Sequence, residues 1–377
     1  MRTMQGVGIA LVFIAILILS GCAENTTRLN NLDSVKIGII TPLTGPTAWL
    51  GSWATTTLQL SAEKINAEGG INGRPLLLLF EDAGNSQQAS IATSKLLNQD
   101  EVTLIYAMTT PVVAGASSVV DQAQTPLFGF TSVQTFAKQY EWVFSDLRDI
   151  GNECVALYEK TVTERTERIA FLGNDADFSQ TCKESVIQKG AQFVAQEIKL
   201  SNEPDAKTQL LKIKEANPDA MLLICWPPDC NIIYRQMLEL NFTPQLLLPL
   251  TTPLPANPIA TKDINKEAIF HNALGTDQAV NIEKPSPELA KFLEDYKTRK
   301  GEPMNYGGDV PVTYDNLQEI AVALRKCPSL NNNCIRDKLR ETDYTGISGR
   351  VKFAGKNTAS RASTLIQYEN GAWKKID

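Results

Sequence analysis

Residues 35–82 read VKIGIITPLTGPTAWLGSWATTTLQLSAEKINAEGGINGRPLLLLFED, and the pattern changes within this stretch. Residues 35–40 form a short, β-branched and mostly apolar run, which predicts a buried strand. Residues 51–67 then place apolar side chains on one helical face, and Gly69-Gly70 ends that helix. Another apolar run over residues 75–81 predicts the next strand. The stretch therefore predicts a β–α–β unit with parallel strands.

The alternation of strand and helix continues through the chain and starts again after Arg148, which predicts two lobes of the α/β class. Because the predicted strands are continuous apolar runs separated by helices, we expect parallel sheets covered on both faces. Near the end of the chain, Asn370-Gly371 predicts a hairpin turn after a strand at 364–369. The other expected strands are 102–106, 127–130, 168–173, 192–197, 220–225, 245–250 and 351–353, and the main further helices are 86–99, 112–122, 154–162, 179–190, 208–216, 232–240, 287–300 and 314–325.

Composition excludes several classes of protein. The 377 residues include 43% apolar and 21% charged side chains, as in soluble globular proteins of about two domains. A net charge of −6 argues against a nucleic-acid partner. His271 is the single histidine, so a multi-histidine metal site is impossible. The phosphate-binding and nucleophile motifs G-x-G-x-x-G after the first strand, G-x-x-x-x-G-K-[ST] and G-x-S-x-G are missing, so we expect no enzyme, no metal and no cofactor.

The N-terminus reads as an export signal. Arg2 precedes an apolar run over residues 6–19, which is short for a membrane helix and fits a signal peptide. Leu19-Ser20-Gly21-Cys22 resembles the lipobox of prokaryotic lipoproteins, in which the peptide is cut before the cysteine and the thiol carries a lipid. We therefore expect a signal peptide at 1–21, a tether at 22–33, and an exported protein anchored through Cys22 to a membrane, periplasmic or at the cell surface. A plain signal peptide or a short anchor helix is the alternative.

The remaining six cysteines allow fifteen disulfide pairings. Short spacings favour Cys225–Cys230 and Cys327–Cys334, which leaves Cys154 with Cys182. A zinc site is a weaker alternative, because neither close pair has C-x2-C spacing and no histidine flanks them. Export favours disulfides, with free buried thiols as the other alternative.

Several motifs follow one another in the first part of the sequence: Pro42-Leu43-Thr44-Gly45-Pro46, the run from Ile65 to Arg74, the run from Glu81 to Asn85, and Ala89. Taken together, they resemble the amino-terminal lobe of type I periplasmic binding proteins of the branched-chain amino acid and amide-binding group. The resemblance extends from Val35 to the C-terminus and weakens after Ser145. It implies two Rossmann-like lobes joined by three crossings, a ligand in the cleft between them, and delivery of the ligand to the permease of an ABC transporter. It also implies a protein without catalytic machinery, which we expect to be monomeric.

The resemblance also places the lobe boundaries. The N-terminal lobe is expected to contain 34–145 and 272–347, and the C-terminal lobe 146–271 and 348–377. The crossings would then lie near 144–147, 271–276 and 346–350. A receptor-linked sensor with the same fold remains an alternative to a transport component, and nothing in the sequence separates the two.

In this family, hydroxyl residues after the third and fourth strands bind the ligand carboxylate, and aromatic side chains cover it. The hydroxyl positions match Thr110 and Ser132, for which helix capping is the alternative role. The aromatic position in loop 174–179 matches Phe178, which keeps the ring but lacks a tyrosine hydroxyl. The full set of expected ligand-binding residues is Trp49, Leu50, Thr109, Thr110, Thr131, Ser132, Val133, Phe178, Trp226, Leu250 and Thr251.

One departure concerns the ligand. Amino-acid binders of the family place an acidic residue near the strand end that corresponds to residues 245–250, and this chain has Leu250-Thr251 there. A buried ammonium without a counter-charge is costly, so we expect a ligand with a carboxylate and an apolar body but no free ammonium, unless Asp229, Asp277 or Asp309 supplies the charge. Tyr106, Phe130 and Phe171 are expected to serve packing, and the run 146–149 to be a solvated face.

Overall fold

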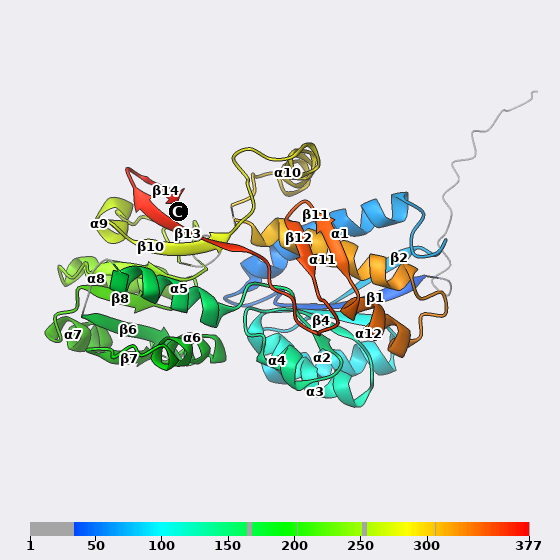
Figure 1. Cartoon of the computed structure of the whole chain (residues 1–377), viewed down its shortest axis with the longest axis horizontal. Helices are drawn as coiled ribbons and strands as arrows, with labels where there is room; N and C mark the ends of the chain where they lie inside the picture. Colours follow the sequence, from blue (N-terminus) through cyan, green and yellow to red (C-terminus); the bar gives the residue numbers. More distant parts are fainter. Residues whose placement is uncertain (1–33, 164–167, 202, 251–254, 306, 377) are drawn as a thin grey trace, which may run out of the picture.

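The computed structural model describes residues 34–163, 168–201, 203–250, 255–305 and 307–376. These residues form two lobes that lie side by side (Figure 1). The expected signal peptide and tether, including Cys22, lie outside the described residues, as does Thr251. No helix within the described ranges has both the length and the apolar character needed to span a bilayer.

The first lobe is built on a five-stranded sheet of order β2-β1-β3-β4-β5 in which all pairs are parallel. Its central strands are buried almost throughout because helices cover both faces, which explains their continuous apolar sequence. The strands are β1 (Val35–Thr41), β2 (Leu76–Asp82), β3 (Leu104–Met108), β4 (Leu127–Phe130) and β5 (Val143–Phe144). The helices are α1 (Ala48–Ala67), α2 (Ser86–Asn98), α3 (Thr110–Gln122), α4 (Thr135–Gln139), α10 (Pro287–Lys300), α11 (Asp309–Arg325) and α12 (Asn332–Arg340).

The second lobe contains a seven-stranded sheet of order β14-β13-β10-β9-β8-β6-β7. Its core is parallel, while β13 runs antiparallel to both β10 and β14. The turn between β13 and β14 is Asn370-Gly371 with positive φ at both residues, as the sequence predicts. The strands are β6 (Ile169–Asn174), β7 (Gln196–Lys199), β8 (Ala220–Leu223), β9 (Gln245–Leu248), β10 (Leu274–Gln278), β13 (Ser363–Glu369) and β14 (Ala372–Lys375), and the helices are α5 (Ile150–Thr163), α6 (Asp177–Gln188), α7 (Lys207–Glu215), α8 (Asp229–Glu239) and α9 (Lys266–Phe270).

The chain passes between the lobes three times, and two of the passages lie later in the sequence than expected. The first connects β5 to α5, close to the expected position. The second follows Gln278, not residue 271, because β10 pairs with β9 of the second lobe. The third follows Phe353, not residue 347, because β12 (Gly349–Lys352) pairs with β11 (Asp343–Gly346) and Phe353 packs in the core of the first lobe. Neither β10 nor β11 is among the strands that the sequence pattern predicts, so the pattern alone could not place these two passages.

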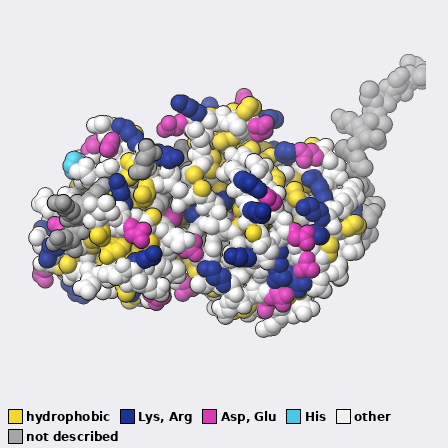
Figure 2. Space-filling model, in the orientation of Figure 1, with side chains coloured by type: hydrophobic (Ala, Val, Ile, Leu, Met, Phe, Trp, Pro, Cys, Tyr) yellow, Lys and Arg dark blue, Asp and Glu magenta, His cyan; other side chains and the backbone are white. Residues whose placement is uncertain are grey.

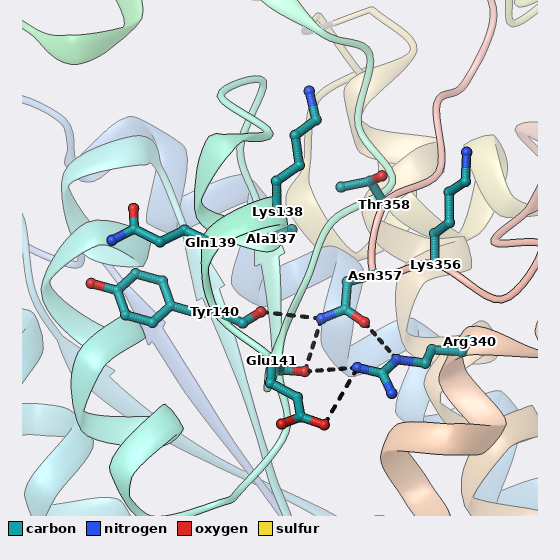
Figure 3. Close-up of a pocket in the computed structure, with 9 residues that line it drawn as sticks. All are labelled: Ala137, Lys138, Gln139, Tyr140, Glu141, Arg340, Lys356, Asn357 and Thr358. Carbon is teal, nitrogen blue, oxygen red and sulfur yellow. Dashed lines mark hydrogen bonds and ion pairs between the residues drawn. The ribbon is translucent and has the colours of Figure 1, made fainter.

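The third passage is fastened to the first lobe by Asn357 (Figure 3). Its side-chain amide donates to the carbonyl oxygens of Tyr140 at 3.1 Å and Glu141 at 2.8 Å, and its Oδ1 accepts from Arg340 Nε at 2.7 Å. Lys138 and Lys356 point away from this network in Figure 3. The contacts hold the start of the passage in place, so we expect lobe rotation to be absorbed beyond residue 358.

The loop after β1 is fixed by an acid at the end of β2. Asp82 Oδ1 accepts from the backbone N–H groups of Leu43 at 2.7 Å and Thr44 at 3.2 Å. The hydrogen bond from the Thr44 hydroxyl, followed by those from the backbone, lowers the pKa of Asp82. A side chain on Gly51 would place its Cβ 2.1 Å from the carbonyl oxygen of Pro42, so α1 begins tightly against this loop. These contacts position Leu50 at the cleft.

All three expected disulfides are present. Cys154–Cys182 joins α5 to α6, Cys225–Cys230 closes the loop between β8 and α8, and Cys327–Cys334 joins the end of α11 to α12.

Candidate functional site

A narrow cavity lies between the two lobes, at the carboxyl ends of the parallel strands where open α/β sheets bind ligands. Its volume is about 40 Å³, enough for a few water molecules, so the lobes must separate to admit an organic solute. Both lobes contribute to its wall. The lining residues are Leu50, Met108, Thr109, Thr110, Phe130, Thr131, Ser132, Leu147 and Asp309 on the first-lobe side, and Phe178, Trp226 and Leu250 from the second.

One part of the cavity wall, around Thr110 and Thr131, is formed by neutral polar groups. Thr110 Oγ1 lies 3.0 Å from Thr131 Oγ1, and Thr131 Oγ1 also accepts from the backbone N–H of Val133 at 3.1 Å. Thr109 has a φ of +77°, a strained conformation for a residue with a side chain, and α3 begins immediately after it. The first turn of α3 therefore presents backbone donors beside the two hydroxyls. Such a group of neutral donors suits a carboxylate or carbonyl oxygen.

The opposite side is apolar and largely aromatic. The rings of Phe178 and Trp226 meet edge to face with centroids 5.9 Å apart. Trp226 lies inside the loop that the Cys225–Cys230 disulfide closes, which restricts where its ring can go. From the first lobe, Phe130 packs edge to face on Trp53 and also faces the cavity. Together with Leu50 these rings would enclose an apolar ligand body.

The structure brings most of the expected residues together. Trp49 is partly buried and packs against apolar clusters of both lobes, and Val133 is buried next to the site, so neither lies on the wall. The sequence analysis did not include Met108, Phe130 and Leu147 among the ligand-binding residues. Met108 and Phe130 are the last residues of β3 and β4, and their position at a strand end could have indicated that they face the cavity. The expected residues on the wall are Leu50, Thr109, Thr110, Thr131, Ser132, Phe178, Trp226 and Leu250.

The run 146–149 is not a solvated face, because Asp146, Leu147 and Arg148 are buried. Arg148 Nη1 lies 2.7 Å from Asp309 Oδ1, and Arg148 Nε lies 2.6 Å from Glu153 Oε1. These three charged residues sit where the lobes meet, since Asp309 begins α11 and Glu153 belongs to α5. The sequence prediction failed here because alternating charges resemble a surface segment, while a partner such as Asp309 lies far away in the chain.

Burial and charge act against each other in this cluster. Burial raises the pKa of Glu153 to about 7, although Arg148 and a hydrogen bond with Thr276 act in the opposite direction. Burial alone would lower the pKa of Arg148, but the carboxylates of Asp309, Glu153 and Asp277 raise it above its usual value. The backbone N–H of Leu250 donates to Glu153 Oε2 at 3.3 Å, which joins the cluster to the cavity wall.

A second buried network ties two of the passages together. Arg361 of the third passage donates from Nε to Asp146 Oδ2 of the first at 2.7 Å, and it also pairs with Glu319. Asn316 Nδ2 donates to Asp146 Oδ1 at 2.9 Å. Burial raises the pKa of Glu319 well above its usual value. Because Asn316 and Glu319 belong to α11, which is buried along nearly its whole length, this network fixes both passages to the first lobe.

Larger hollows open on the outer surface of the first lobe. One, of about 870 Å³, lies between α1, α10, α11 and the β11–β12 hairpin and includes Phe292 and Ile347; Figure 2 shows hydrophobic side chains in this region beneath α10. Another, of about 450 Å³, surrounds Asn357 (Figure 3). A third, of about 350 Å³, lies between α1 and β2 beside Arg299. None of these hollows lies at the strand ends between the lobes, so the cleft remains the candidate site. The described ranges contain no cluster of three or more side chains able to hold a metal ion.

Comparisons with known proteins agree with this architecture. The model of a family described as periplasmic binding protein matches residues 34–372. Leu/Ile/Val-binding protein homolog 7 of Brucella abortus is 24% identical over 365 residues, which cover 89% of this chain and 90% of the relative. The substrate binding protein LivJ of the Streptococcus pneumoniae branched-chain amino acid transporter, solved in complex with isoleucine, has a TM-score of 0.80 at 18% identity over 91% of this chain and 99% of its own.

A second solved structure is an ABC transporter solute binding protein from Rhodopseudomonas palustris in complex with 3,4-dihydroxy benzoic acid. It has a TM-score of 0.78 at 16% identity and covers 91% of this chain and 96% of its own. Both structures have the same overall fold as this chain.

Proposed function

The chain belongs to the periplasmic binding protein family, and on that premise we propose that it captures a small organic solute between its lobes and delivers it to an ABC transporter. The observation that carries the proposal is the cavity at the strand ends, with hydroxyls on one lobe and aromatic rings on the other. The two relatives of known structure support it, because isoleucine and 3,4-dihydroxy benzoic acid each combine a carboxylate with an apolar body. The protein acts by binding and release, not by catalysis.

The geometry suggests how such a solute lies. Its carboxylate or carbonyl head binds Thr110, Thr131 and Ser132 beside the first turn of α3. Its apolar body lies against Phe178 and Trp226 of the other lobe. Because each lobe holds one end of the ligand, binding favours the closed arrangement of the lobes.

The place of action follows from the N-terminal sequence. The protein is exported and held to a membrane through lipid on Cys22, on the periplasmic or cell-surface side. In that position it works as a monomer and meets the membrane-embedded permease of the transporter.

A thermal-shift screen of amino acids, amides and aromatic and aliphatic carboxylates tests the proposal, followed by calorimetry on the hits. A bound ligand stabilises the folded state by mass action, so at least one solute should raise the melting temperature. Thr110→Val should weaken its affinity by about tenfold or more, the usual effect of losing a hydrogen bond to a charged group. Thr298→Val, on the exposed face of α10, is the matched control and should bind as the wild type does. A screen without any stabilising solute, or equal affinity in both variants, would contradict the proposed site.

A further inference from the structure

Asp309 is the acid that reaches the cavity among the three that the sequence singles out. Asp229 has a side chain that is 36% exposed and pairs with Lys199 at 3.4 Å, and Asp277 is not part of the cavity wall. Asp309 lines the cavity from the start of α11, opposite Phe178 and Trp226 of the other lobe. Resting on the proposed function, we propose that Asp309 determines specificity by binding an ammonium group of the solute, so that the preferred ligand is an amino acid.

The contacts of Asp309 leave one oxygen available. Arg148 Nη1 at 2.7 Å and Gln278 Nε2 at 3.4 Å both donate to Oδ1, and among the described residues no hydrogen bond or ion pair involves Oδ2. The side chain of Asp309 is 8% exposed and that of Arg148 is 1% exposed. Because Asp309 forms part of the cavity wall, its carboxylate lies beside the space that a solute would occupy. Arg148 thus fixes the orientation of the carboxylate, and Oδ2 is free to meet a cation.

The charge balance of the cluster favours a cation at this point. Arg148 carries one positive charge and contacts the carboxylates of Asp309 on α11 and Glu153 on α5. Asp277 of β10 acts electrostatically on Arg148 and on Glu153. When Glu153 is ionised, the two carboxyl groups that contact Arg148 outnumber the single guanidinium in a buried setting, which is unfavourable. A ligand ammonium at Asp309 compensates this deficit. A ligand with only a carboxylate adds a further negative charge close to the acids.

The two polar groups of an amino acid then have separate partners. The carboxylate binds the hydroxyls of Thr110 and Thr131, and the ammonium binds Asp309. The strand end at Leu250 stays an apolar wall, as its sequence indicates. The missing acid at that strand end is therefore compensated by one from the other lobe, and the expectation of a ligand without an ammonium is replaced.

Paired ligands test the role of Asp309. Calorimetry would compare leucine with 4-methylpentanoate and phenylalanine with 3-phenylpropanoate, because the members of each pair differ in the ammonium alone. The wild type should bind one of the amino acids at least tenfold more tightly than its deaminated partner. Asp309→Asn keeps an oxygen that accepts from Arg148 but removes the charge, so it should weaken binding of that amino acid by tenfold or more without weakening the deaminated partner. Asp295→Asn, on the surface helix α10, should change neither.

A proton measurement separates a direct role from a structural one. An ammonium beside Asp309 favours the ionised form of Glu153, whose pKa is about 7. Binding of the amino acid near pH 7 should therefore release protons. Calorimetry in buffers of different ionisation enthalpy measures this release, because the observed binding enthalpy then depends on the buffer. Glu153→Gln should abolish the release. A deaminated ligand that binds the wild type as tightly as its amino acid overturns the assignment of Asp309 and leaves the proposed function intact. Binding of neither member of either pair, while another carboxylate from the screen binds, refutes the amino-acid assignment; a screen with no binder at all contradicts the function itself.

Discussion

Glu153→Gln offers a direct energetic test of the cleft cluster. The side chain is 1% exposed, it pairs with Arg148, and it accepts a hydrogen bond from the backbone of Leu250. Glutamine has nearly the same shape and retains an acceptor, but it cannot ionise. The substitution therefore removes the titration of this residue while leaving most of the packing in place.

The magnitude follows from the pKa of Glu153, which burial raises from 4.5 to about 7. A difference of this size corresponds to about 3 kcal/mol. A carboxyl whose pKa is higher in the folded protein binds its proton more tightly there than in the unfolded chain. The contribution of Glu153 to the stability is therefore fully present at pH values below 4.5, and about 3 kcal/mol of it is lost as the pH rises through 7.

Urea unfolding at pH 4.5 and pH 8.5 measures this effect. The free energy of unfolding of Glu153→Gln, relative to the wild type, should rise by about 3 kcal/mol between the two pH values. Other carboxyl groups titrate in both proteins, so their contributions cancel in the difference. Glu294→Gln, on the exposed face of α10, is the control and should follow the wild type at both pH values. Parallel pH profiles for wild type and Glu153→Gln would refute the reasoning.

Three further predictions concern the anchor, the disulfides and the motion of the lobes. Cys22→Ser should release the protein from the membrane fraction or block its processing, and unchanged fractionation and processing would count against lipidation. Replacing Cys154 and Cys182 together by alanine should lower the free energy of unfolding by about 3.5 kcal/mol, and the same change at Cys225 and Cys230 should lower it by about 2 kcal/mol. The losses differ because the first disulfide closes a loop of 28 residues and the second a loop of five. Equal losses in denaturation experiments would argue that the disulfides do not act through the entropy of the unfolded chain. Saturating ligand should reduce the radius of gyration in small-angle scattering as the lobes close, and an unchanged curve would indicate a rigid protein.

The sequence predicts most of the longer strands and helices because each depends on a local pattern, although it does not predict β10, β11 or the short helices α4, α9 and α12. The apolar run at residues 35–40 and the Asn370-Gly371 turn carry their structure within a few residues. The loops after the parallel strands can also be read from the chain, while the choice of Thr110 and Phe178 within these loops depends on the family resemblance. Local signals therefore predict the lobes, and the resemblance supplies the individual residues of the cavity wall.

What the sequence does not predict depends on pairings across the chain. The strand at 274–278 joins the second sheet through its register with β9, and no local feature distinguishes this from pairing in the first sheet. Arg148 and Asp309 are 161 residues apart, so the local sequence around either residue does not indicate their ion pair. Phe130 was expected to serve packing, and it does pack on Trp53, but its position at the end of β4 also exposes it to the cavity.

The position of Arg148 constrains how the lobes can move. It belongs to the first passage, while its partners Asp309 and Glu153 come from opposite sides of the cleft. Leaving a buried arginine without either carboxylate would cost several kcal/mol. We therefore expect Arg148 to keep at least one partner as the lobes separate, so that the cluster acts as a pivot and not as a latch. Closure restores the second contact, and because Asp309 also faces the solute, the same carboxylate connects ligand recognition to the arrangement of the lobes.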